Sequence, residues 1–186
     1  MSSTISEPNT LRIAGTVQDS IVDGPGLRFT VFTQGCPHHC PGCHNPETHD
    51  PAGGTVVPLK TLVDAMCGNP LTTGLTLSGG DPFLQAAQCI PLAQAAKNSG
   101  RNVWIYTGYL YETLIAPEAP EEWRMLLDCA DVLVDGPFLL AQRSLSCHFR
   151  GSCNQRLIDI PKSRATGTVV LWTPPQNSLP FSVPES

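Results

Sequence analysis

Three closely spaced cysteines constrain this chain more than any other feature. Cys36, Cys40 and Cys43 follow a C-x3-C-x2-C spacing within residues 35–45 (GCPHHCPGCHN). A helix or strand cannot aim three such thiols at one centre, whereas a loop punctuated by glycine and proline can wrap around it. Thiolates bind soft metal centres such as zinc, copper(I) or an iron–sulfur cluster. A closed [4Fe–4S] site takes four cysteines, so this motif would leave one iron open to an outside ligand.

The same cysteines also permit a structural interpretation. A closed, redox-silent zinc site can be built from three cysteines and one histidine, and the loop offers His38, His39 and His44. We rank zinc lower because it leaves the glycine-rich run at residues 78–82 (SGGDP) without a role. Most loop histidines are solvated, and we expect His38 and His39 to be so.

The other cysteines do not suggest a disulfide framework, because the chain is long and its N-terminus has no export signal. Cys67, Cys89 and Cys129 lie in apolar, helix-like segments and are expected to be small buried hydrophobic residues. A looser group that offers a second metal site, without a C-x2-C pair, comprises Cys147, His148 and Cys153.

Composition limits the function classes. A chain of 186 residues with 41% hydrophobic content is long enough for one globular domain with a sizeable core. The net charge of −5 argues against nucleic acid as a partner. No run approaches the roughly 18 apolar residues that a membrane span needs. We therefore expect a cytoplasmic protein whose cysteines are reduced and which does not bind membranes.

Apolar and polar periodicity predicts alternating strands and helices. The expected strands are 11–16, 27–33, 74–77, 102–106 and 132–134, with 156–160 and 167–172 as further candidates. The expected helices are 58–67, 83–98 with a break at Pro91, and helical material from about 110 to 130. Residues 46–57 are expected to be a loop. This pattern predicts an α/β fold, a partial (open) β/α barrel with a mainly parallel sheet, over residues 1–172, followed by a proline-rich tail at 173–186.

Four motifs directly follow predicted strands: 35–45, 78–82 (SGGDP), 107–109 (TGY) and 135–138 (DGPF). In parallel α/β folds, ligands bind at the carboxyl ends of the strands. The four motifs are therefore expected to surround one site. Taken alone, Gly79 and Gly80 would indicate only a tight turn.

The cysteine spacing and its flanks resemble the radical S-adenosylmethionine (SAM) enzymes. Residues 22–29 (VDGPGLRF) and 32–36 (FTQGC) are similar to the strand that precedes the cysteines in activases of glycyl radical enzymes. Four further runs, SGGDPF, WIYTGY, DVLVDGPF and FRGSCNQRLID, narrow the resemblance to the activating proteins of anaerobic ribonucleoside-triphosphate reductases. It covers roughly residues 11–165.

The resemblance implies the site residues. Cys36, Cys40 and Cys43 would hold a [4Fe–4S] cluster whose fourth iron binds SAM. SAM would be contacted by residues around the third cysteine and by residues that follow the next two parallel strands. The implied contacts are Gly42, Cys43, His44, Asn45, Gly79, Gly80, Asp81 and Thr107. Asp81 replaces the commoner glutamate and is also a candidate helix N-cap. Gly42 replaces the aromatic residue with which many members pack the adenine.

The resemblance also implies a mechanism and partners. A reduced cluster would cleave SAM to methionine and a 5′-deoxyadenosyl radical, which takes a hydrogen atom from a glycine of the reductase. The cofactors supply this chemistry, so no acid–base pair is needed. A flavodoxin or ferredoxin would supply the electron. We expect residues 135–159, with Arg143, Arg150 and Arg156, near the surface that docks the reductase; such arginines can equally pair with local carboxylates.

Another glycyl radical enzyme, such as pyruvate formate-lyase, is the second candidate partner. The cysteines would work in the same way, and only partner recognition would differ. We rank it lower because the chain has no second ferredoxin-like cysteine insert and no long C-terminal extension.

Overall fold

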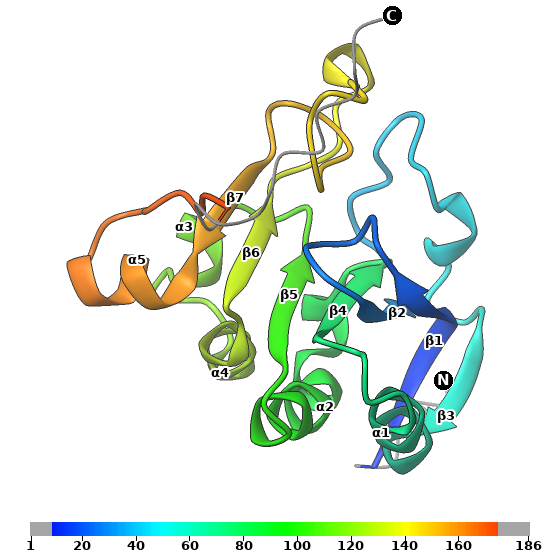
Figure 1. Ribbon diagram of the computed structural model, residues 1–186. Helices are drawn as coiled ribbons and strands as arrows, with labels where there is room; N and C mark the ends of the chain where they lie inside the picture. Colours follow the sequence, from blue (N-terminus) through cyan, green and yellow to red (C-terminus); the bar gives the residue numbers. More distant parts are fainter. Residues whose placement is uncertain (1–8, 175–186) are drawn as a thin grey trace, which may run out of the picture.

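The computed structural model describes residues 9–174, and over this range seven strands form one open sheet in the order β3-β1-β2-β4-β5-β6-β7 (Figure 1). The strands are β1 (Thr10–Ser20), β2 (Arg28–Thr33), β3 (Thr55–Pro58), β4 (Gly74–Gly79), β5 (Asn102–Tyr106), β6 (Val132–Asp135) and β7 (Arg156–Asp159). The tail that we expected at 173–186 lies, from residue 175 onward, outside the described residues.

The centre of the sheet is parallel and its edges are antiparallel. Strands β2, β4, β5 and β6 pair in parallel. β1 pairs antiparallel with β2 and with β3, and β7 pairs antiparallel with β6. The prediction of a mainly parallel sheet is therefore right for the centre and wrong for the edges. The segment between β1 and β2, residues 21–27, is too short for the crossover of a dozen or more residues that a parallel pairing requires.

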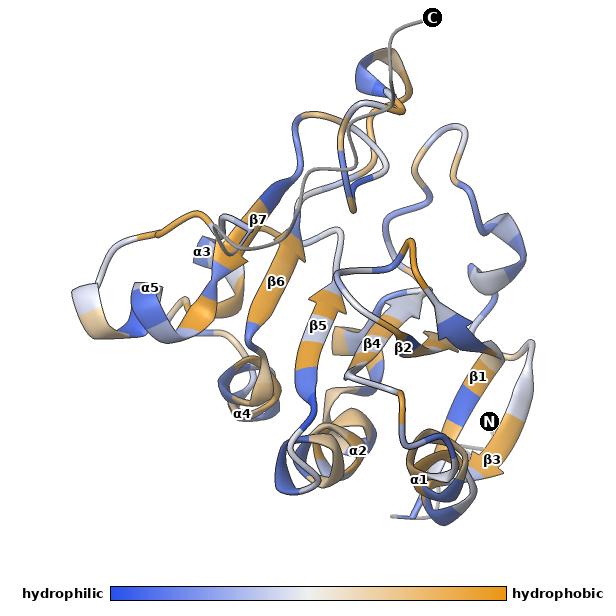
Figure 2. Cartoon of the chain, viewed as in Figure 1, coloured by the Kyte–Doolittle hydropathy of each residue, from blue (hydrophilic) through white to orange (hydrophobic). Residues whose placement is uncertain are grey.

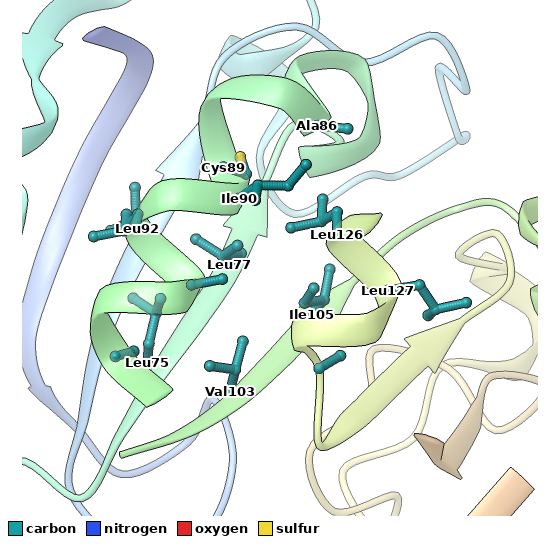
Figure 3. Close-up of a cluster of buried hydrophobic side chains, with 14 of the residues drawn as sticks. Leu75, Leu77, Ala86, Cys89, Ile90, Leu92, Val103, Ile105, Leu126 and Leu127 are labelled. Atoms are coloured by element: carbon teal, nitrogen blue, oxygen red, sulfur yellow. The ribbon is translucent and has the colours of Figure 1, made fainter. Parts of the chain in front are cut away.

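Helices cover one face of the sheet. α1 (Leu59–Gly68), α2 (Ala86–Asn98) and α4 (Glu121–Cys129) lie along it in a row (Figure 1). Their apolar side chains pack on the central strands, which are predominantly hydrophobic in Figure 2. Figure 3 shows Leu75, Leu77, Val103 and Ile105 facing Ile90 and Leu126. The other face of the central strands is also buried, by a second cluster, and burial on both faces explains why these strands are nearly continuous apolar runs.

Two local predictions are wrong. The helix expected at 83–98 does not break at Pro91, which is exposed within α2 while its neighbours Ile90 and Leu92 are buried. The break lies earlier, where the 3₁₀ turn η2 (Pro82–Gln85) meets α2. Residues 46–57, expected to be a loop, contain the 3₁₀ turn η1 (Pro46–Thr48) and most of β3.

A helix that the sequence analysis did not predict precedes residues 167–172, where a strand was expected. α5 (Ile160–Thr166) begins at Asp159, whose side chain accepts a hydrogen bond from the Lys162 amide, and ends at Gly167 with φ +70°. Both are ordinary helix-end signals that were present in the sequence. Of the expected strand, only an isolated bridge between Leu171 and Ile158 forms. The remaining helical elements are α3 (Tyr111–Leu114) and η3 (Leu140–Gln142).

The opposite face of the sheet carries a smaller, mainly aromatic cluster. Trp104 is buried there against Phe149 and Trp172, with ring centroids 5.6 and 5.0 Å away. The fully buried Arg28 lies over the Trp104 ring at 5.5 Å, and burial lowers the pKa of its guanidinium to about 10. Its donors are satisfied by Thr76, by Asn102 and by backbone carbonyls. Phe149 and Tyr106, which pack in this cluster, also line a cavity above the sheet.

Candidate functional site

A cavity of about 760 Å³ opens at the carboxyl ends of the parallel strands. The predicted site residues that line it are Cys36, Cys40, Cys43, His44, Asn45, Gly79, Gly80 and Thr107. Segments far apart in the sequence therefore meet as the strand-end argument requires, with the cysteine loop and residues 136–155 both above the sheet (Figure 1). Gly42 and Asp81 are not among the lining residues.

The three cysteines of the loop are free and half-buried. Burial raises the pKa of the Cys36 thiol, and hydrogen bonds from the backbone amides of His38 and His39 oppose that shift. The Asn45 amide donates to the sulfur of Cys43 at 3.4 Å. Three free thiols on one cavity wall fit a group that is bound through three sulfurs. Within residues 9–174, no three His, Cys, Asp or Glu side chains are grouped as they would be around a single metal ion.

Backbone hydrogen bonds fasten the base of the cysteine loop to the segment that follows it. The amide of Gly35 donates to the carbonyl of Thr48 at 2.7 Å, and the amide of Cys36 donates to that of His49 at 3.2 Å. The Gln34 side chain donates to the carbonyls of Glu47 and Asp50. The first cysteine therefore stands on a fixed base, although the loop has no regular secondary structure.

Gly79 and Gly80 are required by the protein backbone itself. Gly79 has φ +94°, and a Cβ there would lie 2.5 Å from the Cα of Phe32. A Cβ on Gly80 would lie 2.2 Å from the carbonyl oxygen of Gly35, the residue before the first cysteine. Gly79 thus lets the end of β4 lie close to the end of β2, and Gly80 lets it lie close to the start of the cysteine loop. This close approach is a role that we had not predicted.

Asp81 is fully buried and its carboxylate is occupied by protein donors. One oxygen accepts from the Phe83 amide at 3.0 Å, which confirms the predicted N-cap. The other accepts from the Thr107 hydroxyl at 2.8 Å, from the Gly108 amide at 3.0 Å and from His38 Nε2 at 2.7 Å. The structure therefore places the side chains of Asp81 and Thr107 against each other.

The prediction that His38 is solvated is wrong. Its side chain is only 17% exposed and is bound to Asp81. The bare surface of Gly108 makes room for the ring, since a Cβ there would lie 2.4 Å from it. His39, by contrast, is exposed, as predicted. The sequence does not distinguish the two histidines, because the difference depends on contacts with residues more than 40 positions away.

The far side of the cysteine loop meets the segment after β6. The His44 ring lies 4.8 Å from that of Phe138. Gly42 is exposed with φ +72°, and a Cβ there would meet Leu140 at 3.1 Å. Gly42 thus allows the loop to pack against residues 138–140.

The run Asn154-Gln155-Arg156, for which the sequence suggests no physical role, clamps the cavity wall. Asn154 donates to the Pro137 carbonyl at 2.8 Å. Gln155 donates to the Gly136 carbonyl and accepts from two backbone amides of the wall. Arg156 forms ion pairs with the buried Asp135 and with Glu112, which raise the pKa of its guanidinium. For Arg156, pairing with local carboxylates is therefore what the structure shows.

A disulfide joins Cys147 to Cys153 within the same wall. This contradicts the expectation that all cysteines are reduced, and it occupies the two thiols of the suggested second metal site. The sequence analysis did not predict this pairing; the two cysteines are brought together by the bridge between Arg143 and Ser152 and by the hydrogen bond from the Cys153 amide to the Gln142 carbonyl. Of the other three cysteines, Cys89 is buried as expected, Cys129 is half-buried and Cys67 is exposed. No helix among residues 9–174 is both long enough and apolar enough to cross a membrane.

Comparison with known proteins agrees with this site. Residues 22–158 match the family model described as "4Fe-4S single cluster domain". The anaerobic ribonucleoside-triphosphate reductase-activating protein of Haemophilus influenzae is 34% identical over 143 residues, which is 73% of this chain and 89% of that protein. The proteins of the same name from Vibrio cholerae and Escherichia coli K12 are 36% and 35% identical, with 73% of this chain and 89% and 90% of theirs covered.

The matched region contains the three cysteines, the strand ends that surround them and the cavity wall up to β7. The region that matches the family model is therefore the region that forms the cavity. This chain, whose residues 22–158 match the model of a 4Fe–4S single cluster domain, belongs to the family of anaerobic ribonucleoside-triphosphate reductase-activating proteins.

Proposed function

We propose that this protein is a radical SAM activase that generates a glycyl radical on an anaerobic ribonucleoside-triphosphate reductase. The observation that carries the proposal is one open cavity that is lined both by Cys36, Cys40 and Cys43 and by the adjacent Gly79-Gly80 turn. When bound, a [4Fe–4S] cluster and SAM together supply the chemistry, a one-electron cleavage of the sulfonium that ends with hydrogen abstraction from a glycine. The open sheet would then be a partial barrel of the radical SAM type.

The residues of this chain would bind the cluster and SAM, orient them and shield them from water. Cys36, Cys40 and Cys43 would hold the cluster, and their three sulfurs leave one iron for SAM. The backbone at Gly79 and Gly80 lines the cavity without side chains, which favours close contact with the polar end of SAM. Asn45 and His44 line the cavity beside the third cysteine and are the proposed contacts on that side.

The cavity wall at residues 144–151 is the proposed place of contact with the reductase. It lies at the rim, and its Leu145 is 97% exposed. Arg150 lines the cavity and donates to the Gln155 carbonyl at 2.9 Å. A flavodoxin or ferredoxin is the proposed electron donor, because the chemistry requires one electron at a time.

Anaerobic reconstitution with iron and sulfide tests the proposal. The expected product is a brown protein with broad visible absorption that forms 5′-deoxyadenosine from SAM under reduction. On mixing with the reductase, a glycyl-radical doublet should appear in the paramagnetic resonance spectrum. A colourless protein that binds zinc and leaves SAM intact would contradict the proposal. Transfer of the radical to pyruvate formate-lyase, but never to the reductase, would change the partner and leave the cofactor assignment intact.

A further inference from the structure

His38 is anchored from two strand ends, although it lies in the middle of a loop. Nε2 binds the carboxylate of Asp81 after β4, at 2.7 Å. The ring packs edge-on against Tyr109 after β5, with centroids 4.5 Å apart and planes at 76°. It also lies against the bare backbone of Gly108. A loop histidine with three such contacts is fixed in position rather than solvated.

The carboxylate of Asp81 is fully buried, does not line the cavity and is bound on both oxygens by the protein. Oδ2 contacts His38, Thr107 and Gly108, which already exceeds its two lone pairs, and Oδ1 accepts from the Phe83 amide. An ionised carboxylate only accepts, so His38 carries its proton on Nε2 and donates it. The side chain of Asp81 therefore acts on the protein itself.

The position of His38 connects Asp81 to two of the three thiols. His38 lies between Cys36 and Cys40, two residues from each of them. Cys43 has further contacts of its own, because the Asn45 amide donates to its sulfur and the ring of the adjacent His44 packs against Phe138. Since the Cys43 amide also donates to the Cys40 carbonyl at 3.0 Å, a shift of His38 would displace the first two thiols most and the third less.

We propose that Asp81 is a positioning residue which, through His38, sets the Cys36 and Cys40 thiols over the Gly79-Gly80 turn, and that its side chain does not bind SAM. The inference deepens the proposed function, since that function gives the thiols their purpose. The positions of the Cys36 and Cys40 thiols can be tested in the full-length chain without cofactors, independently of that function.

Thiol reactivity tests these positions. His38→Phe keeps a ring against Gly108 and Tyr109 but removes the N–H donor. In the cofactor-free, anaerobic full-length protein, Cys36 and Cys40 should be alkylated about tenfold faster in this variant, because a hydrogen bond to a charged acceptor no longer closes the loop. The rate for Cys43 should rise less than the rates for Cys36 and Cys40. Mass spectrometry of the peptides gives each rate separately.

Two matched variants distinguish a specific effect of the His38 hydrogen bond from a general loosening of the cysteine loop. His38→Gln places an amide N–H close to the position of Nε2 and should restore the wild-type rates. His39→Phe changes the exposed neighbouring ring and should have no effect. If His38→Phe does not fold, as judged by circular dichroism, His38→Asn replaces it, since that amide is too short to reach Asp81. Equal rates for the wild type and both His38 variants would overturn the proposal.

A second measurement uses the iron-loaded protein. In His38→Phe the paramagnetic resonance spectrum of the reduced cluster should change, and in His38→Gln it should match the wild type. An unchanged spectrum in His38→Phe, with SAM binding nevertheless weakened in Asp81→Asn, would indicate that Asp81 contacts SAM directly, contrary to the proposal. If no variant, nor the wild type, takes up iron, the proposed function fails, while the alkylation rates still decide the role of His38.

Discussion

Replacing Gly80 with alanine should disturb the cysteine loop as well as the proposed SAM site. The new Cβ would lie 2.2 Å from the Gly35 carbonyl oxygen and 2.8 Å from its carbon. Both are backbone atoms, so no side-chain rotation relieves the overlap. The same segments are joined by hydrogen bonds from the Gly80 amide to Thr33 and from the Asp81 amide to Gly35, at 2.7 and 2.8 Å.

The size of the effect follows from these distances. Moving the contact from 2.2 Å to an ordinary 3.4 Å requires a shift of 1.2 Å at Gly35, directly before Cys36. Overpacking of this kind costs about 1–3 kcal/mol. Two strained backbone hydrogen bonds add about 1 kcal/mol each. We therefore expect the free energy of unfolding to fall by about 3–5 kcal/mol.

Urea unfolding followed by circular dichroism, and iron content after anaerobic reconstitution, measure the two consequences. Gly68→Ala is the matched control, because its Cβ would meet nothing within 4 Å at the end of α1. It should raise the free energy of unfolding by about 0.4–1 kcal/mol. If Gly80→Ala unfolds at the wild-type urea concentration and binds a full cluster, the backbone approach is looser than we infer.

Four further predictions concern the cluster and the cavity wall. Cys40→Ala should lose bound iron and SAM cleavage while Cys129→Ala keeps both, as iron analysis and 5′-deoxyadenosine yield would show. Arg156→Met should cost about 3 kcal/mol in urea unfolding, because it leaves a buried carboxylate unpaired. The hydrogen bond from Arg156 lowers the pKa of Glu112, so the stabilisation is complete above the ordinary value of 4.5 and is lost as pH falls through the lowered pKa. The difference between the melting temperatures of the wild type and Arg156→Met should therefore shrink as pH falls below 4.5. The Cys147–Cys153 disulfide should hide two thiols from alkylation. Intact mass should therefore show two fewer alkylated thiols in the untreated wild type than in the wild type reduced with a dithiol. Cys147→Ser should abolish that difference.

The sequence was sufficient to locate the site. Cysteine spacing is local, and the β-branched and apolar runs identified the four parallel strands whose carboxyl ends must meet. The comparisons with known proteins confirm the family that the motifs had indicated. These features were predictable because each depends on neighbouring residues in the chain.

The tertiary structure decided how the site is held together. The burial of Asp81, the anchoring of His38 and the clamp at Arg156 all join residues separated by more than 20 positions. The disulfide between Cys147 and Cys153 and the antiparallel edges of the sheet likewise depend on where loops return. A buried carboxylate selects its donors by proximity in space, which local sequence patterns do not encode. The spacing of the three cysteines is thus evident in the sequence, whereas the residues that hold the cysteine loop in position are evident only in the folded molecule.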